Sequence, residues 1–396
     1  MSPRPKIILT LAWCFISATA SWAAEQVMLT EVPDYTWHRG CFGTASGNLM
    51  GYWDRHGLPN LYTGHANSGV APLTDAGTNI WIRSMWVSKA GLDGRPANQP
   101  GHDDDYWIDY ERTDADPYVT VQRLEHEPDC IGDFIGLNQK KWKDLNGECA
   151  GNVDGFSFVF WDTNGTKRFN FVPPSQGPLP VTDIPSGLRA WTKYRGYGSE
   201  VFSQLTDFNP HVPAGNGFSF ADLKAEIDAG YPVLLFWQPT NEMSRALANM
   251  PRANPEIHGM LIYGYYVNNT GLNYVRVKTS WGSSGDTTLI QWSPAYWRSD
   301  FPLNMRGIIG FHPVPKITSA TRTNDIWNFK WDGPSSVLKD LISLTTTNLH
   351  WYVLEKSTKL DTNNFTAITE PTSSREVTIT NCCDDAAFFR VKLLPR

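Results

Sequence analysis

The stretch from residue 219 to residue 311 constrains the fold most, because it predicts one capped helix followed by several strands. Ser219 and Asp222 form a capping-box pattern, an apolar stripe follows, and Gly230 ends the helix. Strands are predicted at 233–237, 258–265, 274–279, 287–292 and 307–311, with turn residues at 268–271. A helix ahead of antiparallel strands is typical of the α+β class.

A second helix is predicted near the start of the chain, from Cys41 to Arg55. Its apolar residues recur at helical spacing, and His56-Gly57 ends it. The region from 58 to 152 is rich in loops. The segment 155–171 is predicted as a hairpin around a turn at 162–165.

The end of the chain is predicted to form a separate domain. A Pro-containing linker at 313–316 precedes short alternating strands at 326–331, 351–357, 377–380 and 388–393. This spacing predicts a small all-β sandwich over 316–396, after a larger domain over 24–315. Trp351 and Tyr352 are expected in the sandwich core. The alternative is that one of these rings binds a sugar.

The first 23 residues have the pattern of a secretory signal. Arg4 and Lys6 precede an apolar stretch over 7–20, and small residues follow at 21–23. We therefore expect a secreted or periplasmic protein. No later stretch reaches the ~20 apolar residues of a membrane helix, so no membrane span is expected. The net charge of −6, without a basic cluster, argues against a nucleic-acid partner.

Loss of this segment would remove Cys14 and leave an odd number of cysteines, so at least one thiol is expected. Cys130 and Cys149 are expected to form a disulfide that closes a loop of roughly 20 residues. The alternative is that both are buried and unpaired. Cys382 and Cys383 are adjacent, so a bond between them would be strained, and two ordinary thiols remain the other interpretation.

Cys41 is the candidate nucleophile because it opens a helix. Unpaired N–H groups and a partial positive charge at that end favour a thiolate, and the same N–H groups can donate to an oxyanion. His258 begins a strand, and the turn near Asn269 places residues 279–281 roughly opposite it. His258 is thus the candidate base.

The acidic run at 102–105 contains residue types that can bind a metal ion, but no spacing pattern supports a site. No metal or cofactor is therefore expected.

Four sequence elements together resemble the papain-like cysteine peptidases. They are Gly40-Cys41 at a helix start, the helix-Gly-Tyr-Pro-strand unit over 220–237, His258-Gly259-Met260, and the run Lys278-Thr279-Ser280-Trp281-Gly282. The likeness spans roughly 33–311 and is nearest to the bacterial group related to bacteriocin leader peptidases. It implies a papain-like N-terminal helix packed on an antiparallel sheet. The C-terminal segment resembles fibronectin-III-like modules of exported bacterial enzymes.

The resemblance implies a role for each matching residue. Cys41 is the nucleophile, His258 the base, and Trp281 the residue that shields the histidine's hydrogen bond. Thr279 occupies the position where the family carries Asn or Asp, so its hydroxyl is expected to accept from the imidazole; Asp286 is an alternative orienting group. Tyr35 occupies the position of the oxyanion-binding Gln and is expected to donate through its phenol.

The implied activity is thiol-dependent hydrolysis of peptide bonds in a peptide or protein substrate, by a monomer. The departures at Thr279 and Tyr35 favour an alternative, a catalytically inactive papain-like scaffold used for binding. In that interpretation the sandwich anchors the protein to a cell surface or a glycan. A third interpretation is acyl transfer to an amine instead of water.

Overall fold

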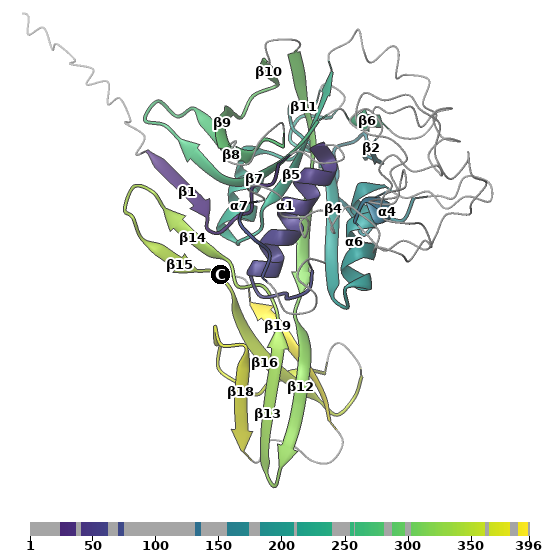
Figure 1. Cartoon of the computed structure of the whole chain (residues 1–396), viewed down its shortest axis with the longest axis vertical. Helices are drawn as coiled ribbons and strands as arrows, with labels where there is room; N and C mark the ends of the chain where they lie inside the picture. The colour runs from purple at the N-terminus through teal and green to yellow at the C-terminus, as the bar shows by residue number, and fades with distance from the viewer. Residues whose placement is uncertain are drawn as a thin grey trace, which may run out of the picture.

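The computed structural model of the chain describes residues 24–36, 41–61, 70–74, 131–135, 157–173, 183–209, 212–239, 254–256, 258–280, 287–297, 302–360, 364–380 and 387–394. These residues form a mixed structure with few helices and mostly antiparallel sheets (Figure 1). Such a structure is compatible with the predicted α+β class and also with a mainly β class. No helix in these ranges is long and apolar enough to cross a membrane.

Within the described ranges the helices are α1 (Cys41–Arg55), α4 (Ile131–Ile135), α6 (Ile184–Tyr194) and α7 (Phe220–Asp228). The bounds of α1 are those predicted, and its residues from Cys41 to Asp54 are all buried. The predicted capping box of α7 is also confirmed. Asp222 N–H donates to Ser219 Oγ at 3.2 Å, Ser219 N–H donates to Asp222 Oδ2 at 2.8 Å, and Gly230 takes a φ of 92°.

The largest sheet among the described residues has 11 strands. Its strands are β1 (Glu25–Leu29), β3 (Arg168–Phe169), β4 (Gly198–Leu205), β5 (Val233–Pro239), β7 (His258–Val267), β8 (Asn273–Lys278), β9 (Thr287–Gln291), β10 (Ala295–Trp297), β11 (Pro302–Val314), β14 (Val337–Asp340) and β15 (Thr346–Asn348). A separate pair joins β2 (Ser157–Val159) to β6 (Asn254–Glu256). The helix α1 packs in front of the large sheet and contacts β7 and β5 (Figure 1).

The large sheet forks at β7. The first half of this strand pairs with β5, which leads on to β11, β4 and β3. Its second half pairs with β1, which leads on to β14 and β15. The opposite edge of β7 pairs with β8 along its whole overlap, interrupted by a bulge between Ile262 and Gly264. The fork lets one strand anchor both arms of the sheet.

Gly264 allows the second arm to approach. A Cβ atom at this position would lie 2.5 Å from the main-chain oxygen of Val27 on β1. Such a contact with backbone cannot be relieved by rotating a side chain. The β1 arm therefore depends on glycine here.

The other described strands near the end of the chain form two three-stranded sheets, called the sandwich below. One contains β12 (Lys316–Thr323), β13 (Ile326–Asp332) and β18 (Glu376–Thr380), and the other contains β16 (Trp351–Ser357), β17 (Thr366–Ala367) and β19 (Phe388–Leu394). They share a core of Phe329, Trp331, Tyr352, Leu354 and Val391. Only Pro315 separates β12 from β11, and the hairpin β14–β15 of the predicted 316–396 segment pairs with β1 of the large sheet.

The predicted hairpin over 155–171 is wrong, although its turn is present. Gly165 N–H donates to Asp162 O at 2.9 Å, which closes the turn. The flanking strands do not pair with each other, because β2 pairs with β6 and β3 pairs with β4. Neither α6 nor β4 was predicted from the sequence. Asp183 caps α6 and Pro185 lies in its first turn, a start signal that was available.

His350 lies buried between the C-terminal end of α1 and the sandwich. Its ring centroid is 6.4 Å from that of Trp53 and 5.6 Å from that of Tyr231, and its Nδ1 accepts from Ser336 N–H at 3.0 Å. Burial lowers the pKa of His350 to about 3, and the neighbouring His56 and His312 add to the effect. The folded protein therefore keeps this imidazole neutral where the unfolded chain would protonate it.

We expect this burial to make folding stability fall as pH drops from about 6.5 to about 3. The unfolded state then binds a proton that the folded state does not, which costs on the order of 3 kcal/mol between pH 7 and pH 4. His350→Asn keeps an acceptor for Ser336 but cannot titrate. Urea unfolding across this range should show a flatter pH dependence in the variant. If the free energy of unfolding changed with pH equally in both proteins, His350 would not be the cause of the pH dependence.

We expect Gly264→Ala to lower the free energy of unfolding by about 1–3 kcal/mol, because the new Cβ would overlap the β1 backbone. Gly198→Ala is the matched control. Its Cβ would meet Val314 Cβ at 3.6 Å, an ordinary contact, so a change within about 0.5 kcal/mol is expected. Chemical denaturation measures both. Equal effects in the two variants would rule out the close approach as the cause.

Candidate functional site

The first turn of α1 meets the first residues of β7, and this contact brings Cys41 beside the His258-Gly259 step. The thiol of Cys41 is fully buried. Gly259 N–H donates to Cys41 Sγ at 3.3 Å. A donor aimed at sulfur and the positive end of the helix both favour the thiolate over the thiol. The fold thus brings Cys41 next to the backbone of the residue that follows His258, which lies 217 positions after Cys41 in the sequence.

Glycine at 259 makes this contact sterically feasible. A Cβ atom there would lie 2.6 Å from Cδ1 of Phe42, whose ring stacks on Phe236 of β5 with centroids 5.3 Å apart. Residues 236 and 259 are also direct partners across the β5–β7 ladder. The helix start is therefore wedged against the point where β5 and β7 pair.

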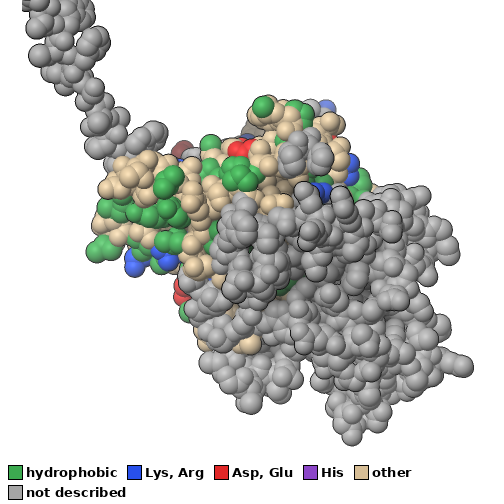
Figure 2. All heavy atoms as spheres, turned by 90° about the horizontal axis from the view of Figure 1, so that it is seen from above, with side chains coloured by type: hydrophobic (Ala, Val, Ile, Leu, Met, Phe, Trp, Pro, Cys, Tyr) green, Lys and Arg blue, Asp and Glu red, His purple; other side chains and the backbone are tan. Residues whose placement is uncertain are grey.

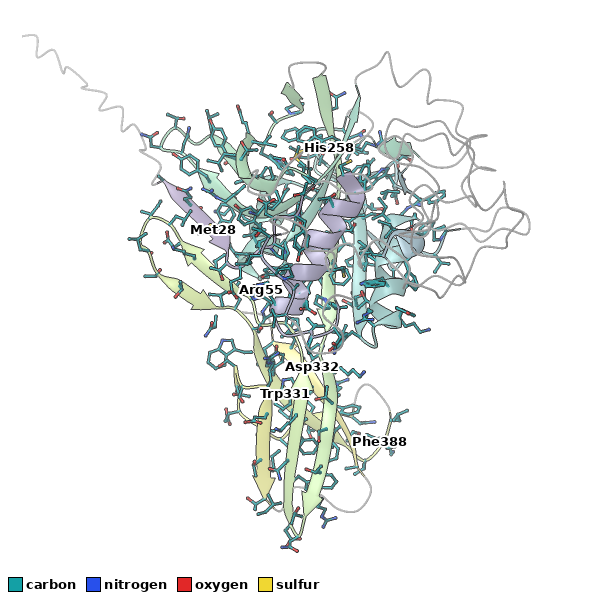
Figure 3. All side chains as sticks on the ribbon, in the orientation of Figure 1. Met28, Arg55, His258, Trp331, Asp332 and Phe388 are labelled. Carbon is teal, nitrogen blue, oxygen red and sulfur yellow. The ribbon has the colours of Figure 1, made fainter. Side chains whose placement is uncertain are left out.

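His258 is oriented by a main-chain carbonyl. Its Nε2 lies 2.7 Å from the oxygen of Thr279, and the residue is 2% exposed. A carbonyl oxygen only accepts, so Nε2 must carry the hydrogen. In the neutral ring Nδ1 is then the acceptor, which is the state that a general base requires. His258 lies at one end of α1 and Arg55 at the other (Figure 3).

Thr279 contacts His258, but through a different atom from the one expected. The sequence predicted a hydrogen bond from the imidazole to the Thr279 hydroxyl, whereas the imidazole contacts the Thr279 main-chain oxygen. The ladder explains this, since its last pair is Leu261 with Lys278 and Thr279 follows directly after β8 ends. A carbonyl that has left the ladder is available to an outside donor. Any residue at position 279 has this main-chain carbonyl.

Tyr35 does not lie where an oxyanion donor is needed, so that prediction is wrong. Its hydroxyl donates to Pro72 O at 2.8 Å, and a Cβ at Gly51 would lie 2.6 Å from it. Gly51 is ten residues beyond Cys41 on α1, which is about 15 Å along the helix axis. The backbone of Tyr35 is also held there, by donation to Asn48 Oδ1 at 3.0 Å. Its segment runs beside the middle of α1.

A buried ion pair lies next to the site and was not predicted from the sequence. Lys278 Nζ lies 3.3 Å from Asp34 Oδ2, with the two side chains 11% and 7% exposed, and 5.1 Å from the ring centroid of Tyr263. Within the described ranges, no group of three or more His, Cys, Asp or Glu residues can hold a metal ion.

Several predicted residues lie outside the described residues: Trp281, Asp286, Cys130, Cys149, Cys382, Cys383 and the 102–105 run. In the sandwich, Tyr352 is in the core as expected, with 1% exposure. Trp351 is 40% exposed, contrary to the expectation that both rings are buried. Adjacent residues of a strand face opposite sides, so only one of the two enters the core.

No protein-family model, no curated protein and no solved structure matches this chain. The functional argument therefore depends on the geometry of the site. Seen from above in Figure 2, the described surface carries hydrophobic side chains among polar atoms, with only scattered charged groups.

We expect Thr279→Val to preserve the site, because valine keeps the shape and the main-chain carbonyl while removing the hydroxyl. The rate at which iodoacetamide alkylates Cys41, followed by peptide mass spectrometry, should stay within about twofold of wild type. His258→Gln is the control. Without the imidazole, the thiolate at pH 6 should fall and the rate should drop about tenfold or more. A large loss in Thr279→Val would return the orienting role to the hydroxyl.

Proposed function

We propose that the chain is an exported thiol-dependent peptidase with a papain-like arrangement, in which Cys41 is the nucleophile and His258 the base. The observation that carries the proposal is the donation from Gly259 N–H to Cys41 Sγ at 3.3 Å, one residue after a histidine oriented by a third group. A thiol at a helix N-terminus beside an oriented base is what acyl transfer through sulfur requires.

The proposed reaction divides hydrolysis into two steps. Nδ1 of His258 takes the proton of the Cys41 thiol, and the thiolate attacks the peptide carbonyl to form a C–S bond. N–H groups at the start of α1 stabilise the oxyanion. The imidazolium gives its proton to the amine as the C–N bond breaks. Water, losing a proton to His258, then attacks the thioester, releasing the acid and restoring the thiolate.

The Thr279 carbonyl has a defined part in this scheme. It keeps the hydrogen on Nε2, so Nδ1 is the nitrogen that exchanges protons with sulfur. It also accepts from the imidazolium, which favours the charged ring. A neutral carbonyl stabilises that charge less than a carboxylate does. We expect a weaker ion pair than an Asp-containing triad would give.

The binding-scaffold alternative is supported by burial. The Cys41 side chain has no exposed surface and His258 is 2% exposed, whereas a peptidase must admit its substrate to both. In this alternative the sandwich supplies attachment to a surface or a glycan, and exposed Trp351 is the aromatic ring offered for it. Export in either case depends on the signal-like residues 1–23.

We expect a thiol-directed covalent peptidase probe to label Cys41 of the folded, reduced protein at a pH between about 5 and 8, because the thiolate is the reactive form. Cleavage of a peptide library should fall by at least about a thousandfold in Cys41→Ala and in His258→Ala. Cys382→Ala is the matched cysteine control and should retain full activity.

Two results would contradict the proposal, and the first of them would favour the scaffold. One is a folded wild type that is neither labelled nor active across this pH range. The other is cleavage that persists unchanged in Cys41→Ala, which would assign the activity to a different group or a contaminant.

A further inference from the structure

Ser280 has a backbone conformation that residues other than glycine rarely adopt. Its φ is 59°, in the left-handed region, where the Cβ atom crowds the backbone. Conformations of this kind persist where the surrounding structure demands them, and they gather at functional sites. Ser280 directly follows Thr279, whose carbonyl orients His258.

The direction of that carbonyl depends on two torsions. The peptide plane between residues 279 and 280 contains the Thr279 oxygen, so ψ of Thr279 and φ of Ser280 set where it points. On the other side, the end of β8 is anchored by the Lys278–Asp34 ion pair at 3.3 Å. Thr279 therefore lies between a fixed strand end and a left-handed turn.

The hydroxyl of Ser280 does not hold this turn. Ser280 is 4% exposed, and its Oγ is buried without a hydrogen-bond partner within the part of the chain that the structure describes. A buried hydroxyl that bonds to nothing adds no stabilisation to its own conformation. The constraint thus comes from the backbone, and serine is small enough to tolerate it.

We propose that Ser280 is a positioning residue, whose left-handed backbone turns the Thr279 carbonyl toward Nε2 of His258 while its hydroxyl takes no part. The inference deepens the proposed function, since it explains how the base is oriented. Loss of the turn would move the carbonyl away from the ring. The imidazolium would lose a hydrogen-bond acceptor and would form less readily. The Cys41 thiolate would then be stabilised less by the positive charge of His258.

Two substitutions separate backbone from hydroxyl. Ser280→Gly removes the hydroxyl and adopts a positive φ freely, whereas Ser280→Thr keeps the hydroxyl and disfavours a positive φ through its branched Cβ. The measurement is the pH dependence of iodoacetamide alkylation at Cys41, resolved by mass spectrometry. It requires no peptide substrate.

We expect Ser280→Gly to alkylate within about twofold of wild type, with the same pH profile. In Ser280→Thr the rate at pH 6 should fall about tenfold, and the pH at which the alkylation rate is half-maximal should rise by about one unit, because a less stabilised imidazolium stabilises the thiolate less. A residue with only a structural role would not shift that pH. Circular dichroism and thermal unfolding establish that each variant is folded.

The reverse result would overturn the proposal, namely a tenfold loss in Ser280→Gly with Ser280→Thr unchanged. A folded Ser280→Thr with the wild-type profile would overturn it as well. If Ser280→Thr does not fold, the glycine variant alone decides, since a tenfold loss there contradicts a role of the backbone. Should the wild type cleave no peptide while the alkylation profiles behave as expected, the peptidase proposal fails and the positioning role stands.

Discussion

The site depends on the contact between the first turn of α1 and the start of β7. Phe42 fills the space that a side chain at Gly259 would occupy, and stacks on Phe236 of the neighbouring strand. This packing leaves Gly259 N–H facing Cys41 Sγ. A larger residue at 259 would separate the helix from the sheet and the thiol from the base. Steric exclusion at one glycine thus controls the geometry of the whole site.

The strand that carries the base also organises the sheet. One edge of β7 pairs with β5 and then with β1, while the other pairs with β8. The ladder with β5 reaches His258, whereas the ladder with β8 begins at Leu261, so backbone pairing holds the base from the β5 edge. The β1 arm continues through β14 and β15, so a segment beyond β12 and β13 of the sandwich completes the larger sheet. The two units are therefore connected by more than a linker.

Local signals predicted the elements well. The apolar spacing over 41–55, the Ser219 and Asp222 pair, and the strands of the sandwich all appear where the sequence placed them. Pairing partners were predicted poorly. The turn at Asp162–Gly165 is real, yet its flanking strands join other segments. Turn chemistry is local, whereas strand pairing depends on which distant edge is available.

The sequence by itself determined which residues are chemically suited to the site: a cysteine opening a helix, a histidine opening a strand, and a turn that sets Thr279 near that histidine. Only the tertiary structure decided which atoms act. It placed the Tyr35 hydroxyl beside Gly51 instead of near Cys41, and it gave the orienting role to the carbonyl of Thr279. The physical reason is that a side chain's identity is written in the sequence. The direction of a backbone carbonyl depends on torsion angles fixed by packing.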